Sequence, residues 1–222
     1  MLYVLSLSVL VGWLLGSIPV AYLVVRIAGG GDLRHEGSAS VGATNAYRVS
    51  GSRLVAAVVL LLDVAKGALS VLLALWLMQA FAPGAWEAPF WSAAGGLLGA
   101  VAGHNYNPLL SWGHSRLAGG KGLATACGGL LLLMPAILPV WIAAFGVGFL
   151  AFSRWRGVRS ALPGNVLATL VSPLAAWWWY GLAGLFVVAL LAFLILPRHR
   201  RQLHALLSTP GLLVSRAHGS DE

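Results

Sequence analysis

A succession of long apolar runs constrains the fold of this chain more than any other feature. A helix needs roughly 20 apolar residues to cross a hydrocarbon core of about 30 Å, and several runs of the 222-residue chain reach that length. Hydrophobic residues make up 59% of the chain and charged residues only 9%, whereas soluble domains carry about 25% charged residues. The sequence therefore predicts an all-α, polytopic helical bundle embedded in a membrane.

The basic residues indicate how the chain is threaded through the bilayer. Apart from Lys66, every lysine and arginine lies in residues 26–53, 104–121 or 153–159, or from 197 onward. Cytoplasmic loops are enriched in these two residue types, so we place all four segments in the cytoplasm. Attraction of these segments to anionic lipid accounts for the net charge of +8, and we expect no nucleic-acid partner.

The apolar runs between these segments give about seven spans, with the N-terminus outside and the C-terminus cytoplasmic. The expected single spans are Met1–Val25, Leu54–Phe81 and a glycine-rich run that begins near Pro89. Residues 122–152 would form a helix of about 46 Å, too long for one crossing, so we expect a turn at Pro135–Pro139. Residues 160–196 should turn at the aromatic residues Trp177–Tyr180. Five spans is the alternative if either pair fails to cross fully.

A glycine cluster around Lys121 is the first candidate binding element. Gly119, Gly120 and Gly122 flank this lysine where a polar loop meets an apolar run. Glycines allow a ligand to approach the backbone, and a helix that starts just after them adds positive charge from its N-terminus. The loop is not a Walker A motif, because Ser115 and Gly122 occupy positions that need glycine and Ser/Thr. A phosphate site and an ordinary tight turn both remain open.

The first cytoplasmic loop adds further polar groups in Gly37–Arg48. It carries Ser38, Thr44 and Asn45 as well as Arg48, whose guanidinium can hold a phosphate through two parallel hydrogen bonds. Contact of Arg48 with lipid headgroups is the alternative. Three basic, glycine- and hydroxyl-bearing loops on one membrane face favour a site for a phosphorylated molecule.

Other kinds of chemistry find less support in the sequence. The histidines are scattered and Cys127 is the only cysteine, so we expect no metal site. No nucleophile elbow of the Gly-x-Ser-x-Gly type occurs. Asp63 and Lys66, three residues apart within a predicted span, share one helical face and should point into the bundle. A structural ion pair and a catalytic role are both open for them.

Six segments, taken together, are similar to those of one family. They are GSIPVAYLVVR (16–26), GSASVGATNAYRVSG (37–51), LLDVAKGALSV (61–71), GHNYNP (103–108), GGKGLAT (119–125) and a final H-R-R-x-L-x-x-L-L (199–207). In order and spacing they resemble the bacterial membrane acyl-phosphate:glycerol-3-phosphate acyltransferases (PlsY family) over roughly residues 10–207. The chain is accordingly expected to form one transmembrane domain over 1–207, followed by a flexible cytoplasmic tail over 208–222.

The resemblance implies an activity and a set of residues. It implies a bacterial plasma-membrane enzyme, with its site at the cytoplasmic face, that moves an acyl group from acyl phosphate to the 1-hydroxyl of glycerol 3-phosphate. The products are lysophosphatidic acid and phosphate, and no cofactor is expected. By position the catalytic residues are Ser38, Arg48, Lys121 and His199, and the substrate-binding residues are Thr44, Asn45, His104, Gly119, Gly120, Gly122, Ser160 and Gln202.

Three motifs depart from the family pattern. Ala39-Ser40 stands where the family usually has Gly-Asn, and Gly157 replaces the first serine of a pair whose second member is Ser160. Gln202 replaces an asparagine and Gly211 a glutamate. The sequence therefore leaves open a divergent active enzyme, an altered donor or acceptor, and a paralogue that acts as a transporter, a lipid- or phosphate-binding protein, or a structural subunit.

Overall fold

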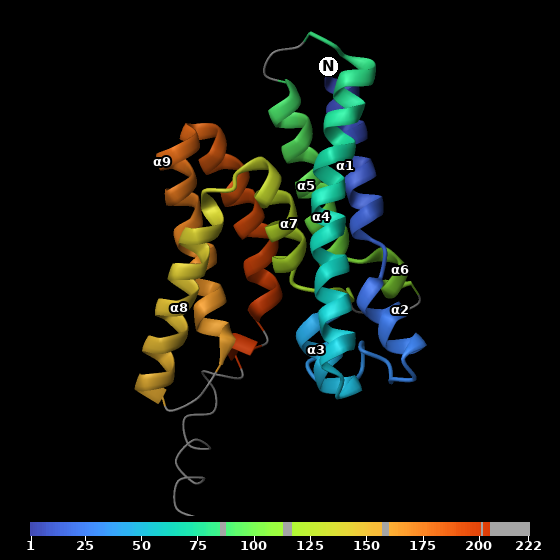
Figure 1. Cartoon of the computed structure of the whole chain (residues 1–222), viewed down its shortest axis with the longest axis vertical. Helices are drawn as coiled ribbons and strands as arrows, with labels where there is room; N and C mark the ends of the chain where they lie inside the picture. The colour runs from blue at the N-terminus through green and yellow to red at the C-terminus, as the bar shows by residue number, and fades with distance from the viewer. Residues whose placement is uncertain (85–87, 113–116, 157–159, 201, 205–222) are drawn as a thin grey trace, which may run out of the picture. The chain divides into compact units, whose positions relative to one another are not determined.

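The computed structural model of the chain describes residues 1–84, 88–112, 117–156, 160–200 and 202–204, and every regular element in them is helical. The chain divides into two compact units, Met1–Pro135 and the part from Ala136 onward (Figure 1). The tail expected over 208–222 and the departures at Gly157 and Gly211 lie outside the described residues.

The first unit is built around the long helix α4. Its helices are α1 (Leu2–Gly16), α2 (Val20–Ile27), α3 (Ala43–Ser50), α4 (Arg53–Phe81), α5 (Ala88–Asn105), α6 (Pro108–Ser111) and α7 (Leu123–Leu133). Helix α4 packs against α1, α5 and α7, and α1 packs closely along α5 (Figure 1). The short helices α2 and α3 pack on α4 as well, so the loops that carry the polar motifs are attached to one scaffold.

Close packing of these helices depends on small residues at the crossings. A Cβ on Gly12 of α1 would strike the backbone of Gly96 in α5, and a Cβ on Gly67 of α4 would strike that of Thr125 in α7. Lipid offers no hydrophobic drive for helix association, so such close backbone approach is a main source of packing energy in membranes. The glycine-rich composition of the predicted third span is therefore explained by its contact with α1.

The first predicted span is interrupted in the structure. Helix α1 ends at Gly16 and α2 begins at Val20, because Pro19 lacks an N–H and disfavours helical backbone at the residue before it. The interruption leaves backbone carbonyls without helical partners inside the bundle. Two of them accept hydrogen bonds from the buried side chain of Lys66, those of Gly16 at 3.2 Å and Ile18 at 3.4 Å.

The second unit consists of α8 (Ile137–Arg156), α9 (Ala161–Ile195) and a final 3-10 turn, η1 (Leu196–His199). Helix α8 packs against α9. The turn predicted at Pro135–Pro139 is present, since α7 ends at Leu133 and α8 begins at Ile137. Helical structure continues through the aromatic residues where a turn was predicted, and α9 is broken one residue later at Gly181 (φ 63°), giving the two limbs seen in Figure 1.

The described residues contain four helices long and apolar enough to cross a membrane. They are Leu2–Ile27, Arg53–Phe81, Ile137–Trp155 and Ala161–His199, and Leu123–Leu133 is a shorter apolar helix. The all-helical membrane fold is thus confirmed. The count of seven crossings and the orientation of the termini stay predictions.

Candidate active site

The glycine loop joins α6 to α7 and lies against the end of α5. As expected, a helix starts directly after it, with Gly122 in the left-handed region (φ 76°) as the N-cap of α7. The Gly120 N–H donates to the carbonyl of His104 at 3.0 Å. A Cβ on Gly120 would strike the His104 ring and approach the Val41 carbonyl to 2.6 Å. Glycine is therefore required here by close packing, whether or not a ligand also approaches.

Hydrogen bonds tie the glycine loop to the loop between α2 and α3. The Val41 N–H donates to the Gly119 carbonyl at 3.1 Å. On the other side, the Asn107 N–H donates to the Ala118 carbonyl at 2.9 Å, and the Asn107 amide donates to the Ser17 carbonyl at 2.8 Å. The structure thus brings two motifs that are far apart in sequence into one backbone network.

Asn45 supports the turn that carries Ser38. Its side-chain oxygen accepts the Ser38 N–H at 2.8 Å, and its amide nitrogen donates to the carbonyls of Glu36 at 3.0 Å and Leu33 at 3.3 Å. The side chain is buried and uses both ends on the protein itself. Asn45, which the sequence predicts as a substrate-binding residue, is thereby built into the loop as a clamp.

One departure from the family pattern falls on a strained position. Ala39 adopts φ 53°, directly after Gly37 with φ 61° and Ser38. A residue with a Cβ in the left-handed region costs roughly 1–2 kcal/mol, which glycine avoids. The alanine at this position therefore adopts a backbone conformation that glycine would adopt at lower energetic cost.

Two cations face the same region from these loops. Helix α3 exposes Thr44 and Arg48, which are four residues apart and lie on one face. Burial, and after it the positive charge of Arg48, lowers the pKa of Lys121 to about 8. Two cations held within electrostatic range destabilise each other unless an anion lies near both. This arrangement is typical of an anion-binding site.

Arg34, in contrast, is committed to the loop structure. Its guanidinium lies 2.7 Å from the Asp32 carboxylate and 5.2 Å from the centre of the Tyr22 ring. The hydrogen bond from Arg34 holds the pKa of Asp32 at about 2. The ion pair consequently stays intact at neutral and alkaline pH, and the loop it closes keeps its shape there.

Three predicted residues belong to the second unit. Ser160 is the N-cap of α9, where its hydroxyl accepts the Leu162 N–H at 3.3 Å. His199 is buried in η1, with Nδ1 3.1 Å from the Ile195 carbonyl. When Nδ1 donates to that carbonyl, the neutral ring has its lone pair on Nε2, as a base requires. Gln202 lies half-buried in the helical turn 202–204.

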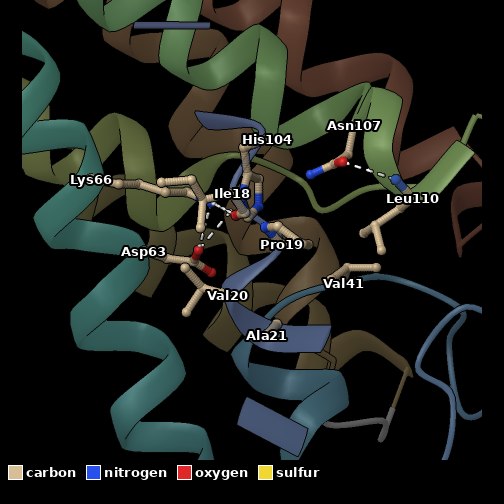
Figure 2. A pocket seen from close by; sticks show the side chains of 10 residues that line it. All are labelled: Ile18, Pro19, Val20, Ala21, Val41, Asp63, Lys66, His104, Asn107 and Leu110. Carbon is tan, nitrogen blue, oxygen red and sulfur yellow. Dashed lines mark hydrogen bonds and ion pairs between the residues drawn. The ribbon is translucent and has the colours of Figure 1, made fainter. Parts of the chain in front are cut away.

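Two features of the first unit go beyond the sequence prediction. His104, predicted to contact substrate, is buried beside Asp63 (Figure 2), and its ring lies against Gly120 of the glycine loop. Asn107 was not singled out, although its side chain caps α6 by accepting the Leu110 N–H at 3.1 Å. An asparagine directly before Pro108 is a helix-start signal that could have identified it.

The sequence also matches the family model described as glycerol-3-phosphate acyltransferase over residues 6–209. The chain belongs to this family. The glycerol-3-phosphate acyltransferase of Halalkalibacterium halodurans is 33% identical over 202 residues, covering 91% of each chain. That of Azotobacter vinelandii is 40% identical over 201 residues, covering 90% of this chain and 94% of its own.

Solved structures give the same assignment for the fold. The crystal structure of PlsY, an integral membrane glycerol 3-phosphate acyltransferase, in its glycerol 3-phosphate form matches with a TM-score of 0.71 at 28% identity, covering 91% of this chain and 92% of PlsY. Its lysophosphatidic acid form matches with a TM-score of 0.69 at 25% identity, covering 91% of each chain. The family's helical membrane fold thus extends over most of the chain.

Proposed function

We propose that this protein transfers a fatty acyl group from an acyl phosphate to the 1-hydroxyl of glycerol 3-phosphate, giving lysophosphatidic acid and inorganic phosphate. The observation that carries the proposal is the pair of cations at the glycine loop, Lys121 and Arg48, in a chain that belongs to the glycerol-3-phosphate acyltransferase family. Both substrates are phosphates, and a site with two neighbouring cations suits them. We place the reaction at the cytoplasmic face of a bacterial plasma membrane.

An acyl phosphate is a mixed anhydride and is already activated, so the reaction needs no protein nucleophile. The hydroxyl oxygen of glycerol 3-phosphate attacks the acyl carbon, the bond from that carbon to the phosphate oxygen breaks, and phosphate leaves. Holding the hydroxyl at the acyl carbon can lower the barrier by roughly 7–11 kcal/mol. Ser38, which Asn45 holds in place, would orient the acceptor.

The charged groups have separate roles in this scheme. Lys121 and Arg48 hold the phosphates and, with amides of the glycine loop other than that of Gly120, stabilise developing negative charge. We assign to His199 either a phosphate contact or removal of the hydroxyl proton, and an oxygen of the donor phosphate is the alternative base. The donor's acyl chain would lie among the membrane helices.

The test is an acyl transfer assay with palmitoyl phosphate and glycerol 3-phosphate in detergent or native membranes. We expect Lys121→Ala and Arg48→Ala each to lower kcat/KM by about 100-fold or more, as for loss of a charge-stabilising group. Arg53→Ala is the matched control, because it removes an exposed arginine from the start of α4, and we expect near-normal turnover. Near-normal turnover of both site variants would overturn these roles. Absence of lysophosphatidic acid from the wild-type reaction would overturn the function.

A further inference from the structure

A buried charged cluster lies behind the glycine loop. Figure 2 shows Asp63 and Lys66 of α4 directed toward each other, with His104 of α5 beside them. The Asp63 carboxylate lies 2.9 Å from Lys66 Nζ and 3.5 Å from His104 Nδ1. All three residues are buried, with 2%, 5% and 7% of their surface exposed for Asp63, Lys66 and His104. Ionisable groups inside a membrane bundle are costly and are usually retained for a function.

The ion pair between Asp63 and Lys66 does not by itself explain why charged residues are retained inside the bundle. A buried pair can often be replaced by apolar residues of similar size without loss of stability. Lys66 has a further structural task, because its ammonium donates to the carbonyls of Gly16 and Ile18 at the break between α1 and α2. These contacts fix the position of Lys66, and Lys66 in turn fixes the Asp63 carboxylate.

His104 connects this cluster to the glycine loop. One edge of its ring, at Nδ1, faces Asp63, and the opposite edge, at Nε2, lies where a Cβ on Gly120 would be. The backbone carbonyl of His104 also accepts the Gly120 N–H at 3.0 Å. Lys121 follows directly in sequence, so the ring forms the support beneath the residue that presents this cation.

We propose that Asp63, held by Lys66, is a positioning residue that orients the His104 ring and thereby fixes the glycine loop in its anion-binding conformation. The inference rests on the proposed function, since the anion is taken to be glycerol 3-phosphate. It deepens that function, because it assigns a role in substrate binding to Asp63 and Lys66, which lie behind the glycine loop. Carboxylates that orient metal-ligating histidines change metal affinity or activity 10- to 100-fold when they are removed, and we take the lower end of that range for the effect of Asp63 on anion binding.

The experiment compares variants that separate positioning from folding. Asp63→Asn leaves Lys66 buried without its counter-ion and can fail to fold, so the main variant is Asp63→Leu/Lys66→Met, which removes both charges at similar volume. We expect this double variant to fold with a lower thermal midpoint, because the Gly16 and Ile18 carbonyls lose the Lys66 ammonium as a donor. It should raise KM for glycerol 3-phosphate about tenfold and leave KM for palmitoyl phosphate within about twofold. Direct binding of glycerol 3-phosphate, measured by titration calorimetry in detergent, should weaken by the same factor.

Two further variants control the interpretation. Ser70→Ala removes another buried polar group from α4, one that donates only within the helix to the Gly67 carbonyl, and it should leave both KM values unchanged. His104→Phe keeps a flat ring without its nitrogens. Its effect on KM should not add to that of the Asp63→Leu/Lys66→Met variant, because both changes act through the same ring.

The outcomes test the positioning role of Asp63 and the proposed function separately. A double variant that folds and keeps the wild-type KM for glycerol 3-phosphate overturns the positioning role and leaves the proposed function standing. The positioning role is also overturned if the effects of His104→Phe and Asp63→Leu/Lys66→Met on KM for glycerol 3-phosphate add in the combined variant, because additive effects indicate independent contributions. Wild-type protein that neither binds nor acylates glycerol 3-phosphate overturns the proposed function and the inference with it.

Discussion

Lys121 should give glycerol 3-phosphate binding a pH dependence that an ordinary lysine would not. Burial and the charge of Arg48 lower its pKa from 10.5 to about 8. A bound phosphate favours the ammonium form and raises the pKa again. As the pH rises through 8, Lys121 therefore loses its proton in the free enzyme before it does so in the complex. Binding of glycerol 3-phosphate must weaken as the pH rises.

The size of the effect follows from the protonated fraction. With a pKa of about 8, Lys121 is about half charged at pH 8 and about one tenth charged at pH 9. If only the charged form binds phosphate, KM for glycerol 3-phosphate should rise about twofold between pH 6.5 and 8, and about tenfold between pH 6.5 and 9. A lysine at its ordinary pKa of about 10.4 would stay almost fully charged over this range and leave KM nearly constant.

Initial rates of lysophosphatidic acid formation at varied glycerol 3-phosphate and fixed palmitoyl phosphate, from pH 6.5 to 9.5, measure this dependence. A reaction without enzyme corrects for alkaline hydrolysis of the donor. Lys121→Arg is the matched control, because a guanidinium stays charged throughout this range, and its KM should not change between pH 7 and 9. A wild-type KM that is flat to pH 9.5, or the same rise in Lys121→Arg, would refute the reasoning.

Three substitutions test the backbone around the site and in the bundle. Gly120→Ala places a Cβ against the His104 ring and should lower kcat/KM at least tenfold, as expected for roughly 1–3 kcal/mol of overpacking. The control is Gly42→Ala, whose added Cβ has open space, and its kcat/KM should stay within about twofold of the wild-type value. Gly67→Ala strikes the backbone of α7 and should lower the thermal midpoint in detergent by several degrees, whereas Gly146→Ala, with open space around it, should not. Ala39→Gly relieves a left-handed alanine and should raise the midpoint by about 2–4 °C, as for about 1 kcal/mol; a lower midpoint would contradict the assignment of strain.

Much of the fold could be predicted because membrane insertion imposes a simple rule on sequence. Apolar runs, basic loops and prolines predicted the helices, the turn near Pro135 and the polar loops. The interruption at Ser17–Pro19 falls inside a run that was predicted as a single span, because hydropathy does not report how a proline changes the backbone. The break in α9 falls at Gly181 and not at the preceding aromatic residues, since an aromatic belt marks a membrane interface, whereas the helix is interrupted where glycine adopts a positive φ.

The roles of individual residues in the candidate site were harder to predict than the fold. Sequence grouped Ser38, Asn45 and Arg48 by proximity, but it could not show that Asn45 turns its amide inward to hold the Ser38 loop. It placed Asp63 and Lys66 on one face of a helix, but the approach of His104 from α5 depends on packing between helices. Helical spacing reports neighbours within one element, and contacts between elements follow from the glycines at the crossings.

The two groups of charges in the first unit differ in a way that bears on catalysis. Asp63 and Lys66 neutralise each other in the bundle, whereas Lys121 lies within electrostatic range of a like charge. In the proposed reaction, negative charge grows on the phosphate oxygen as its bond to the acyl carbon breaks. Cations placed where this charge grows stabilise the transition state more than the ground state. Lys121 and Arg48 should therefore raise kcat as well as bind phosphate.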